Sequence, residues 1–236
     1  MGAVEGGPNV IYDGLIFCSD AANTKSYVSG STTWNDLTSS QRSGTLTNGP
    51  TFDTGGGGNI VFDGTNDYVT FGNALNTGQN FTVTAWIKPG AISIRNCIVG
   101  NSYPYVGRQG WIFSTATGYV GLTNTFFLSI GTDVSYRTAA NSSITPNIWN
   151  FVSATVSNGG TIALYVNGVE TSYAGSSLTT GTITYTTNEF HVGLRYTQNN
   201  YDFFKGNISV VNIYNRVLSS IEILQNYNTT KTRFGL

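Results

Sequence analysis

Short runs of alternating apolar and polar residues recur along most of the chain, separated by clusters of Gly, Asn, Ser, Thr and Asp. In "NFTVTAWIKPG", every second residue from Phe81 to Ile87 is apolar, and Pro89 follows where the run ends. Successive side chains of a strand point to opposite faces, so this run predicts a strand with one face in a core. Helical periodicity is absent until the C-terminal end. The pattern is typical of an antiparallel all-β domain with many turns.

The run "IWNFVSATVSNGGTIALYVNGVETSYAG" predicts three consecutive strands. Apolar residues alternate first from Val152 to Val156 and again from Ile162 to Val166. The connectors "NGG" and "NG" supply residues that tolerate positive φ, as tight hairpins require. We therefore expect a meander of two hairpins.

The segment "SSIEILQNYNTTK" predicts one short helix near the C-terminus. Ser219 and Glu222 have the Ser-x-x-Glu spacing of a capping box, in which each residue bonds to the backbone of the other. Ile221, Leu224 and Tyr227 recur at helical spacing. We expect these three side chains to dock the helix on the sheet.

The length of 236 residues fits one domain, because all-β sandwiches commonly run past about 200 residues without splitting. We expect a single domain over residues 10–236, which includes the helix at about 219–230 and the tail after it. Residues 1–9, "MGAVEGGPN", form a glycine-rich arm that is too polar to pack alone. Contacts with neighbouring subunits are therefore expected to order this arm.

Charged residues are scarce, at 10% of the chain against a typical ~25%, and the formal net charge is -1. The basic residues are scattered singly, so no positive surface would gather phosphates, and nucleic acid is excluded as a partner. No apolar run approaches the ~20 residues of a membrane helix, so we expect no membrane partner. The start "MGAVEGGPNV" lacks the basic and apolar regions of a signal peptide, which predicts an unprocessed chain.

Two cysteines and one histidine limit the chemistry further. Cys18 and Cys97 are both flanked by apolar residues, which suits buried free thiols better than a disulfide framework. His191 stands alone in "EFHVGL", which excludes multi-histidine metal sites and predicts an ordinary strand residue.

Six segments of the chain resemble a known family: "DGLIFCSDAANTKSY", "TTWNDL", "GTLTNGPTF", "IVFDGTNDYVTFG", "FTVTAWIKP" and "GNISVVNIYNRVLSSIEILQNYNTTKTRFG". Together, over about residues 10–235, they are similar to the laminin-G-like, concanavalin A-like jelly-roll family, in the form found in tailed-phage virion proteins and bacterial surface proteins. The resemblance implies an all-β fold, a two-sheet antiparallel jelly-roll sandwich with one short C-terminal helix. It also implies a carbohydrate-facing sheet or rim in many members and a structural calcium in some. Lectins, glycanases, adhesins and structural modules share this fold, so function has to be argued from the site.

An enzymatic role is the least favoured reading. Glycoside hydrolysis needs two carboxylates about 5–10 Å apart across a cleft. Glucanase relatives carry Glu-x-Asp-x-x-Glu on one strand, and this sequence has no such triplet. Its glutamates, Glu5, Glu170, Glu189 and Glu222, have no acidic partner nearby in sequence. We therefore expect a protein that is not an enzyme, with a carbohydrate-active enzyme as the less favoured alternative.

Two acidic turns are candidate metal sites. Asp63, Asn66 and Asp67 lie between "NIVF" and "YVTF", where Asp side chains commonly bond to turn amides. Asp20 and Asn23, in "CSDAANTKSY", match the family's N-terminal motif, and turn capping accounts for them too. Carboxylate and amide oxygens are also suitable ligands for Ca²⁺, which is the alternative at both places. No cofactor is required by this reading, and calcium is the one that the residues allow.

Two stretches, "NSYPYVGRQGW" and "LRYTQNNYDFF", combine aromatic rings with polar side chains. Sugar-binding proteins place aromatic rings against the apolar faces of pyranoses, with polar groups directed at the hydroxyls. Aromatic residues with Arg are equally a signature of protein interfaces. The candidate carbohydrate-binding or interface residues are Tyr103, Tyr105, Arg108, Trp111, Arg195, Tyr196, Asn199, Asn200, Tyr201 and Asp202.

These observations favour a virion structural protein of a tailed phage: a decoration, fibre-base or adhesin subunit on the virion surface, assembled in the host cytoplasm. Its expected partners are other virion proteins or copies of itself, and host-surface glycan. The alternative is a glycan-binding lectin domain of a tail fibre or of an extracellular or cell-surface protein. An exposed aromatic platform would distinguish the lectin from the purely structural module.

Overall fold

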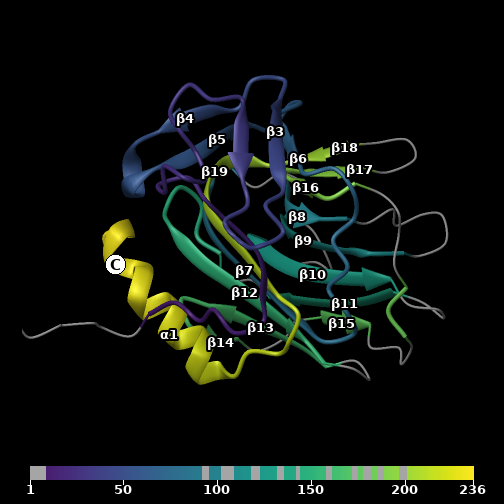
Figure 1. Ribbon diagram of the computed structural model, residues 1–236. Coiled ribbons are helices and arrows are strands. Elements are labelled where there is room, and N and C mark those ends of the chain that lie inside the picture. The colour runs from purple at the N-terminus through teal and green to yellow at the C-terminus, as the bar shows by residue number, and fades with distance from the viewer. Residues whose placement is uncertain are drawn as a thin grey trace, which may run out of the picture.

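The computed structural model describes residues 9–91, 96–101, 109–117, 123–131, 136–141, 144–157, 161–171, 175–177, 182–184, 189–196 and 201–236. Within 136–141 and 175–177, and at Tyr196, it describes the backbone alone. In these ranges the chain forms two large antiparallel sheets, one short separate hairpin and a C-terminal helix (Figure 1). The expected two-sheet antiparallel sandwich with one short C-terminal helix is confirmed.

The first sheet, called the helix-side sheet below, carries the C-terminal helix on its outer face. Its strands run in the order β14 (Val169–Glu170), β13 (Ile162–Val166), β12 (Asn150–Val156), β7 (Phe81–Pro89), β19 (Lys205–Tyr214), β5 (Asn59–Asp63) and β4 (Thr51–Asp53). β1 (Leu15–Asp20) also pairs with β19, beyond the part of β19 that pairs with β5.

The second sheet is called the open sheet, because no helix among the described residues covers its outer face, although the outward-facing Ile112 and Phe127 are buried there. Its strands run in the order β15 (Gly175–Ser177), β11 (Tyr136–Asn141), β10 (Thr125–Gly131), β9 (Trp111–Ala116), β8 (Asn96–Gly100), β16 (His191–Val192), β6 (Tyr68–Thr70), β3 (Ser43–Thr47) and β2 (Thr33–Asn35). The separate hairpin is formed by β17 (Leu194–Tyr196) and β18 (Tyr201–Phe203).

The main core lies between the two sheets and is rich in aromatic side chains. Its largest fully buried members are Phe17, Trp34, Phe62, Phe81, Trp111, Phe113, Phe126 and Phe190. Each buried Val, Leu, Ile or Phe contributes about 1.5–3 kcal/mol relative to exposure, so alternation over many strands supplies the stabilising free energy.

The expectation that β7 has only one buried face is wrong. Phe81 and its alternate neighbours face the core, as expected, but the opposite face is buried as well. Thr82 Oγ1 donates to the Arg216 carbonyl at 2.8 Å and accepts from the Leu218 amide at 2.9 Å. Trp86 is 1% exposed beneath the C-terminal helix. The face that carries Thr82 and Trp86 is covered by a segment more than 120 residues later in the chain. Strand periodicity alone does not reveal such a cover.

The meander is confirmed by β12, β13 and β14, which pair in sequence order. Asn167 and Gly168, which join β13 to β14, have φ values of 52° and 81°. These two positive φ values are those of the tight hairpin that the "NG" connector predicts. The other connector, residues 158–160, lies outside the described residues.

The C-terminal helix α1 (Ser220–Thr230) begins at the expected capping box, with Ser219 as its N-cap. The Ser219 amide donates to Glu222 Oε2 at 2.8 Å, and the Glu222 amide donates to Ser219 Oγ at 3.3 Å. Arg216, which precedes the helix, forms an ion pair with the same carboxylate, with 2.7 Å between its guanidinium and Glu222 Oε1. A short 3₁₀ turn over Lys231–Phe234 follows the helix.

The expected docking face of α1 is wrong in part. Ile221 is 76% exposed and Leu224 is 41% exposed, whereas Ile223 is fully buried. Tyr227 packs on the sheet as expected, with its ring 5.8 Å from that of Trp86, and Leu224 lies beside Gly168 in the turn between β13 and β14. The capping box fixes where the helix starts and so turns Ile223, Asn226, Tyr227 and Thr230, spaced i, i+3, i+4 and i+7, toward the sheet.

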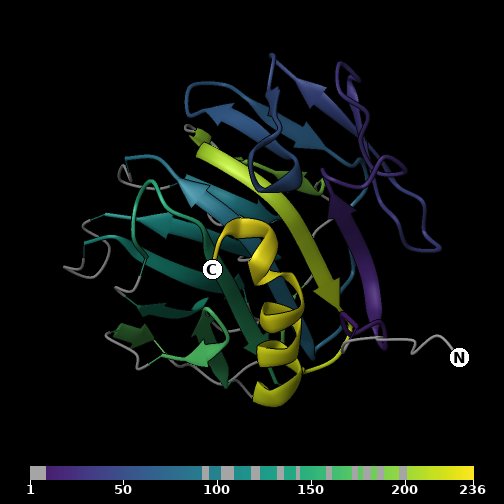
Figure 2. The same cartoon turned by 90° about the vertical axis from the view of Figure 1, so that its left-hand side faces the viewer.

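The chain enters the fold along α1 (Figure 2). Gln225 Nε2 donates to the Asn9 carbonyl at 2.7 Å, and the Ile11 amide donates to Asn226 Oδ1 at 2.8 Å. Of the expected arm, residues 1–8 lie outside the described residues. Segment 9–12 is thereby fixed to the helix before β1 begins.

The remaining expectations for single residues can be compared directly with the structure. Cys18 and Cys97 are both free, as expected; Cys97 is fully buried and Cys18 is partly buried. Burial raises the pKa of each thiol to about 12. His191 is a strand residue, also as expected. In the part of the chain that the structure describes, no helix is long and apolar enough to span a membrane.

Candidate functional site

Four rings form a continuous row on the outer face of the open sheet and the adjacent hairpin. The Tyr201 and Phe203 rings are stacked at 5.7 Å with an interplanar angle of 17°. Phe203 lies 6.5 Å from Tyr68, and Tyr68 lies 5.7 Å from the His191 ring. We call Tyr201, Phe203, Tyr68 and His191 the aromatic row.

Strand alternation places these rings outside the core. On β6, Val69 is fully buried in the core and its neighbour Tyr68 points outward; on β16, Val192 is fully buried and its neighbour His191 points outward. Val69 and Val192 are paired across the two strands, which brings their outward neighbours onto the same face. The β17–β18 hairpin then adds Tyr201 and Phe203 beside Tyr68.

Polar groups border the His191 end of the row. His191 Nε2 lies 3.3 Å from Glu189 Oε2, and Thr70 Oγ1 donates to the same oxygen at 3.1 Å. Burial lowers the pKa of His191 below its usual range, although the neighbouring carboxylate acts in the opposite direction. The ring is therefore neutral at neutral pH, and a carboxylate and a hydroxyl stand next to it.

Exposure differs along the row. Tyr201 is 56% exposed, while Phe203, Tyr68 and His191 are partly buried. An exposed ring backed by stacked neighbours presents a rigid apolar face with hydrogen-bonding groups at its border. This combination suits the apolar face of a sugar ring and its hydroxyls.

Arg195 and Asp202 do not belong to this exposed surface. They are paired across β17 and β18, and their side chains form an ion pair. The Arg195 side chain is 6% exposed and that of Asp202 is 19% exposed. Because residues alternate along a strand, this pair lies on the opposite side of the hairpin from Tyr201 and Phe203. Its contribution is to hold the hairpin that carries the two rings.

Trp111, which was expected to contribute to a ligand-binding surface, does not do so. Its side chain is 0% exposed and packs in the core, 5.4 Å from the Phe81 ring. A ring enclosed between two sheets cannot contact a ligand at the surface, so the expectation for Trp111 is wrong. The other candidates cannot be compared: Tyr103, Tyr105, Arg108, Asn199, Asn200 and the Tyr196 side chain lie outside the described residues.

The acidic turn between β5 and β6 is built as the sequence predicts. Asp63 Oδ1 accepts from the Thr65 amide at 2.7 Å and from the Asn66 amide at 3.2 Å, which lowers the pKa of Asp63. Asp67 Oδ2 accepts from the Asp63 amide at 3.0 Å, and burial raises the pKa of Asp67. The left-handed Gly64 completes the turn. Both carboxylates thus cap backbone amides.

The second candidate metal site is also held by protein groups. Asp20 Oδ1 accepts from the Ala22 amide at 2.9 Å, and Arg233 lies 2.9 Å from the same carboxylate. Asn23 Oδ1 accepts from the Lys25 amide at 3.0 Å. Among the described residues no group of three or more His, Cys, Asp or Glu side chains is arranged to hold a metal ion.

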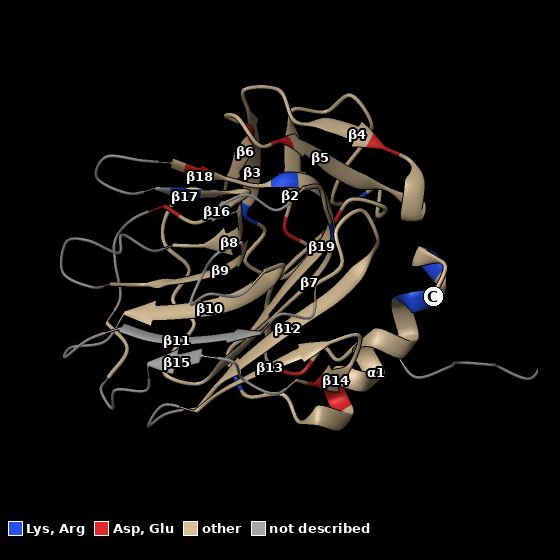
Figure 3. Cartoon of the chain, turned by 180° about the vertical axis from the view of Figure 1, so that it is seen from behind, with Lys and Arg blue, Asp and Glu red and all other residues tan. Residues whose placement is uncertain are grey.

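Charge is sparse over the described surface. Figure 3 shows Lys, Arg, Asp and Glu scattered over the fold. Glu222, one of the few glutamates, is engaged by Arg216 and Ser219 in the helix cap.

Sequence reasoning identified Tyr201 and missed the other three rings of the row. Tyr68, His191 and Phe203 come from three separate segments, and each alone reads as an ordinary strand residue. The available signal was alternation: each lies next to a residue that is buried, so each had to point outward. Their meeting on one face depends on strand register, which local patterns do not specify.

Comparisons with known proteins agree on the fold. Residues 63–224 match the family model described as the concanavalin A-like lectin/glucanases superfamily, laminin G type. The botulinum neurotoxin serotype D binding domain superposes with a TM-score of 0.67 at 16% identity, over 92% of this chain and 52% of that chain. The botulinum neurotoxin type G receptor binding domain gives 0.65 at 15% identity, over 92% of this chain and 51% of that chain. This chain thus spans about half the length of those toxin domains.

A third structure matches over nearly its whole length. Domain 4 of AbnA, a GH43 extracellular arabinanase from Geobacillus stearothermophilus solved in complex with arabinotriose, gives a TM-score of 0.66 at 19% identity. The match covers 90% of this chain and 98% of that one. No curated protein sequence matches this chain. At these identities the structural likeness establishes a shared fold.

Proposed function

This chain belongs to the concanavalin A-like lectin/glucanase superfamily, and from that premise we propose that it is a non-enzymatic carbohydrate-binding module whose ligand stacks on the aromatic row. The observation that carries the proposal is the row itself: four adjacent rings on the outer face of the open sheet and the adjacent hairpin, with Tyr201 more than half exposed. Such a surface binds sugars through ring stacking.

The chemistry at the ends of the row supports a neutral, hydroxyl-rich ligand. Glu189 and Thr70 supply oxygens that accept or donate hydrogen bonds to hydroxyl groups next to His191. Because His191 is neutral and the nearest carboxylate is already hydrogen-bonded, the described residues around the row form no cluster of like charge that would attract an ion. An uncharged oligosaccharide lying along several rings fits this arrangement better than a charged monosaccharide.

The related structures support the same class of ligand. The arabinanase domain was solved with arabinotriose, and one botulinum neurotoxin serotype D domain was solved with N-acetylneuraminic acid. Those ligands belong to those proteins. Their value for this chain is that the fold accommodates sugar ligands in more than one setting.

Non-enzymatic binding is supported by what the carboxylates do. The Glu-x-Asp-x-x-Glu triplet of the glucanases is absent from the sequence. Asp63, Asp67 and Glu222 are committed to backbone amides or to Arg216. Glycoside hydrolysis requires two facing carboxylates, and these three residues do not supply them.

We further propose that the module is carried on the outside of a tailed-phage particle, as a decoration, fibre-base or adhesin subunit that contacts other virion proteins or copies of itself. The resemblance of segments such as "IVFDGTNDYVTFG" to phage virion proteins supports this assignment. Many copies on one particle would convert weak sugar contacts into avid attachment. Co-purification of the protein with phage particles tests it, and a protein that is found only free in lysate argues against it.

The sugar-binding proposal is tested on an array of uncharged oligosaccharides, followed by calorimetric titration of the best ligand. Tyr201→Ala removes the most exposed ring and is expected to weaken binding about three- to tenfold, the equivalent of one stacking contact. Ile221→Ala removes an apolar side chain from α1 that is 76% exposed, against 56% for Tyr201, and serves as the control. No binding on the array, or equal affinity of the two variants, would contradict the proposal.

A further inference from the structure

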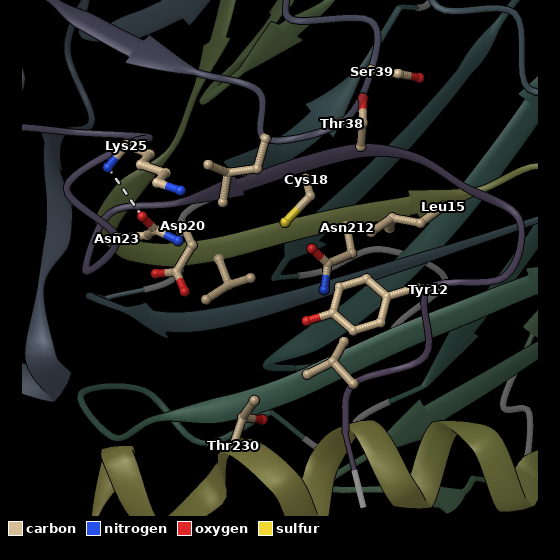
Figure 4. A pocket seen from close by; sticks show the side chains of 13 residues that line it. Tyr12, Leu15, Cys18, Asp20, Asn23, Lys25, Thr38, Ser39, Asn212 and Thr230 are labelled. Carbon is tan, nitrogen blue, oxygen red and sulfur yellow. Dashed lines mark hydrogen bonds between the residues drawn. The ribbon is translucent and has the colours of Figure 1, made fainter.

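A cavity lies on the outer face of the helix-side sheet, away from the aromatic row. Its volume is about 480 Å³, within the range of small-molecule sites. The entering segment, β1, the loop after β2, β19 and the end of α1 all contribute to its lining (Figure 4). Segments that are distant in sequence therefore meet around one hollow, and none of the four rings of the aromatic row belongs to it.

One end of this cavity is apolar. Tyr12 and Leu15 lie there, and the Tyr12 side chain is 70% exposed (Figure 4). Val10, Leu37 and Val210 add further apolar side chains to the lining. A ligand with an apolar body would remove this surface from water, which is the main source of binding free energy in such sites.

The opposite end of the cavity is polar and contains a neutralised carboxylate. Figure 4 shows Asp20, Asn23 and Lys25 together at this end. Arg233 binds both oxygens of Asp20: its Nη1 donates to Oδ2 at 2.9 Å, and its Nη2 lies 2.9 Å from Oδ1. A guanidinium that holds a carboxylate by two oxygens compensates its charge fully. Asp20 is therefore already provided with its counter-ion.

Lys25 is the cation that remains uncompensated at the polar end. It is exposed, and among the described residues no carboxylate forms an ion pair with it. Because Arg233 neutralises Asp20, the Lys25 ammonium leaves one net positive charge beside the apolar walls. A lone surface lysine binds little by itself, so the apolar surface next to it decides which anion is retained.

We infer that this cavity binds a small alkyl carboxylate, such as a medium-chain fatty acid, with its carboxylate at Lys25 and its chain against Tyr12 and Leu15. A singly charged carboxylate matches one lysine better than a phosphate does, since the neighbouring Arg233 is committed to Asp20. The inference goes beyond the proposed function and does not depend on it, because the two sites share no residue.

NMR of the methyl groups in the full chain tests binding directly. Octanoate is expected to shift the methyl signals of Leu15, Leu37 and Val210, which line the cavity. Acetate at the same concentration is expected to leave them unchanged, because it has the charge without the apolar chain. Octan-1-ol has the chain without the charge and is expected to bind about three- to fivefold more weakly than octanoate.

Two lysine variants separate the proposed contact from the general charge of the protein. Lys25→Gln is expected to weaken octanoate binding about three- to fivefold and to leave octan-1-ol binding unchanged. Lys205→Gln is the matched control, because Lys205 is also exposed, lies at the start of β19 and does not line the cavity. This control is expected to bind octanoate as the unmodified chain does.

Tyr12→Ala tests the apolar end. It removes apolar surface, so it is expected to weaken octanoate and octan-1-ol binding to a similar extent, about threefold each. Tyr201→Ala, which alters the aromatic row, is expected to leave octanoate binding unchanged. The inference is overturned if octanoate shifts none of the three methyl signals, if acetate shifts them equally, or if the two lysine variants lose the same affinity.

Discussion

The two outer faces of this sandwich each carry a row of aromatic side chains, and the two rows differ in exposure. On the helix-side sheet, Trp86 is 1% exposed and stacks on Phe234 with 4.0 Å between ring centroids. On the β17–β18 hairpin beside the open sheet, Tyr201 is 56% exposed and stacks on Phe203 at 5.7 Å. Both rows are made by strand alternation, and only one of them lies under a helix.

The difference lies in the covering element. Helix α1 and the 3₁₀ turn after it place Tyr227 and Phe234 over Trp86, and Thr230 Oγ1 accepts the indole N–H at 2.8 Å. No described element covers Tyr201 in this way. A ring whose polar atom is bonded and whose faces are packed contributes to stability, whereas a ring left open is available to a ligand.

Substitution of the covered ring is expected to have the largest effect. Trp86→Ala removes the largest side chain of the buried cluster between the helix-side sheet and α1, and should lower the free energy of unfolding by about 3–5 kcal/mol. Tyr201→Ala should change it by less than about 0.5 kcal/mol, as for other exposed positions. Urea denaturation of both variants measures the contrast. Similar losses for the two would show that the open row is structural and would remove the basis of the comparison.

Helix α1, which covers Trp86, depends on its N-terminal capping box for stability. Glu222→Gln removes the ion pair with Arg216 and should cost about 1–2 kcal/mol. Arg216 and the Ser219 amide hold the pKa of Glu222 at about 2, below that of the unfolded chain. The stabilisation is therefore complete above about pH 4.5 and is lost as pH falls toward 2. Thermal melts of both proteins between these pH values should converge at the acid end; a constant gap would contradict this account.

The turn that leads into β6 also links the two faces, since it connects a strand of the helix-side sheet to the strand that carries Tyr68. Asp63→Ala deprives the Thr65 and Asn66 amides of their acceptor and should cost about 1 kcal/mol. Because these oxygens already serve the backbone, EDTA and added calcium should both leave the melting temperature unchanged. A lower melting temperature in EDTA would instead assign calcium to one of the two acidic turns.

The smallest expected effect concerns His191, at the end of the aromatic row that Glu189 and Thr70 border. Its pKa is lowered by burial, so the unfolded chain takes up a proton more readily than the folded one. This group therefore stabilises the fold fully above its unfolded pKa of about 6.5, and the contribution declines as pH falls below it. His191→Gln should flatten the stability profile between about pH 5 and pH 7, measured by urea denaturation. An unchanged slope would show that His191 is not desolvated as described.

Local chemistry made much of the fold predictable. The Ser219 and Glu222 cap, the Asn167-Gly168 hairpin and the Asp63 turn each follow from a few neighbouring residues, and each is present. Alternation along β7 correctly identified its core-facing residues. These features require no knowledge of distant parts of the chain.

The site was less accessible to the same reasoning. Trp111 and Tyr201 look alike in sequence, yet one is enclosed between sheets and the other is exposed. Arg195 shares the buried side of the hairpin with its cross-strand partner Asp202, opposite Tyr201 and Phe203, a matter of hairpin register. What separates a binding ring from a core ring is the presence of a covering element, and that element comes from elsewhere in the chain.

The hydrogen bonds that join Asn9 and Ile11 to Gln225 and Asn226 of α1 also determine where the chain enters the domain. They bring the entry of the chain alongside its final helix, on the side of the sandwich away from the β17–β18 hairpin (Figure 1, Figure 2). A carrier joined near either of these segments would approach from the helix side. The aromatic row would then face outward, toward whatever surface the carrier meets.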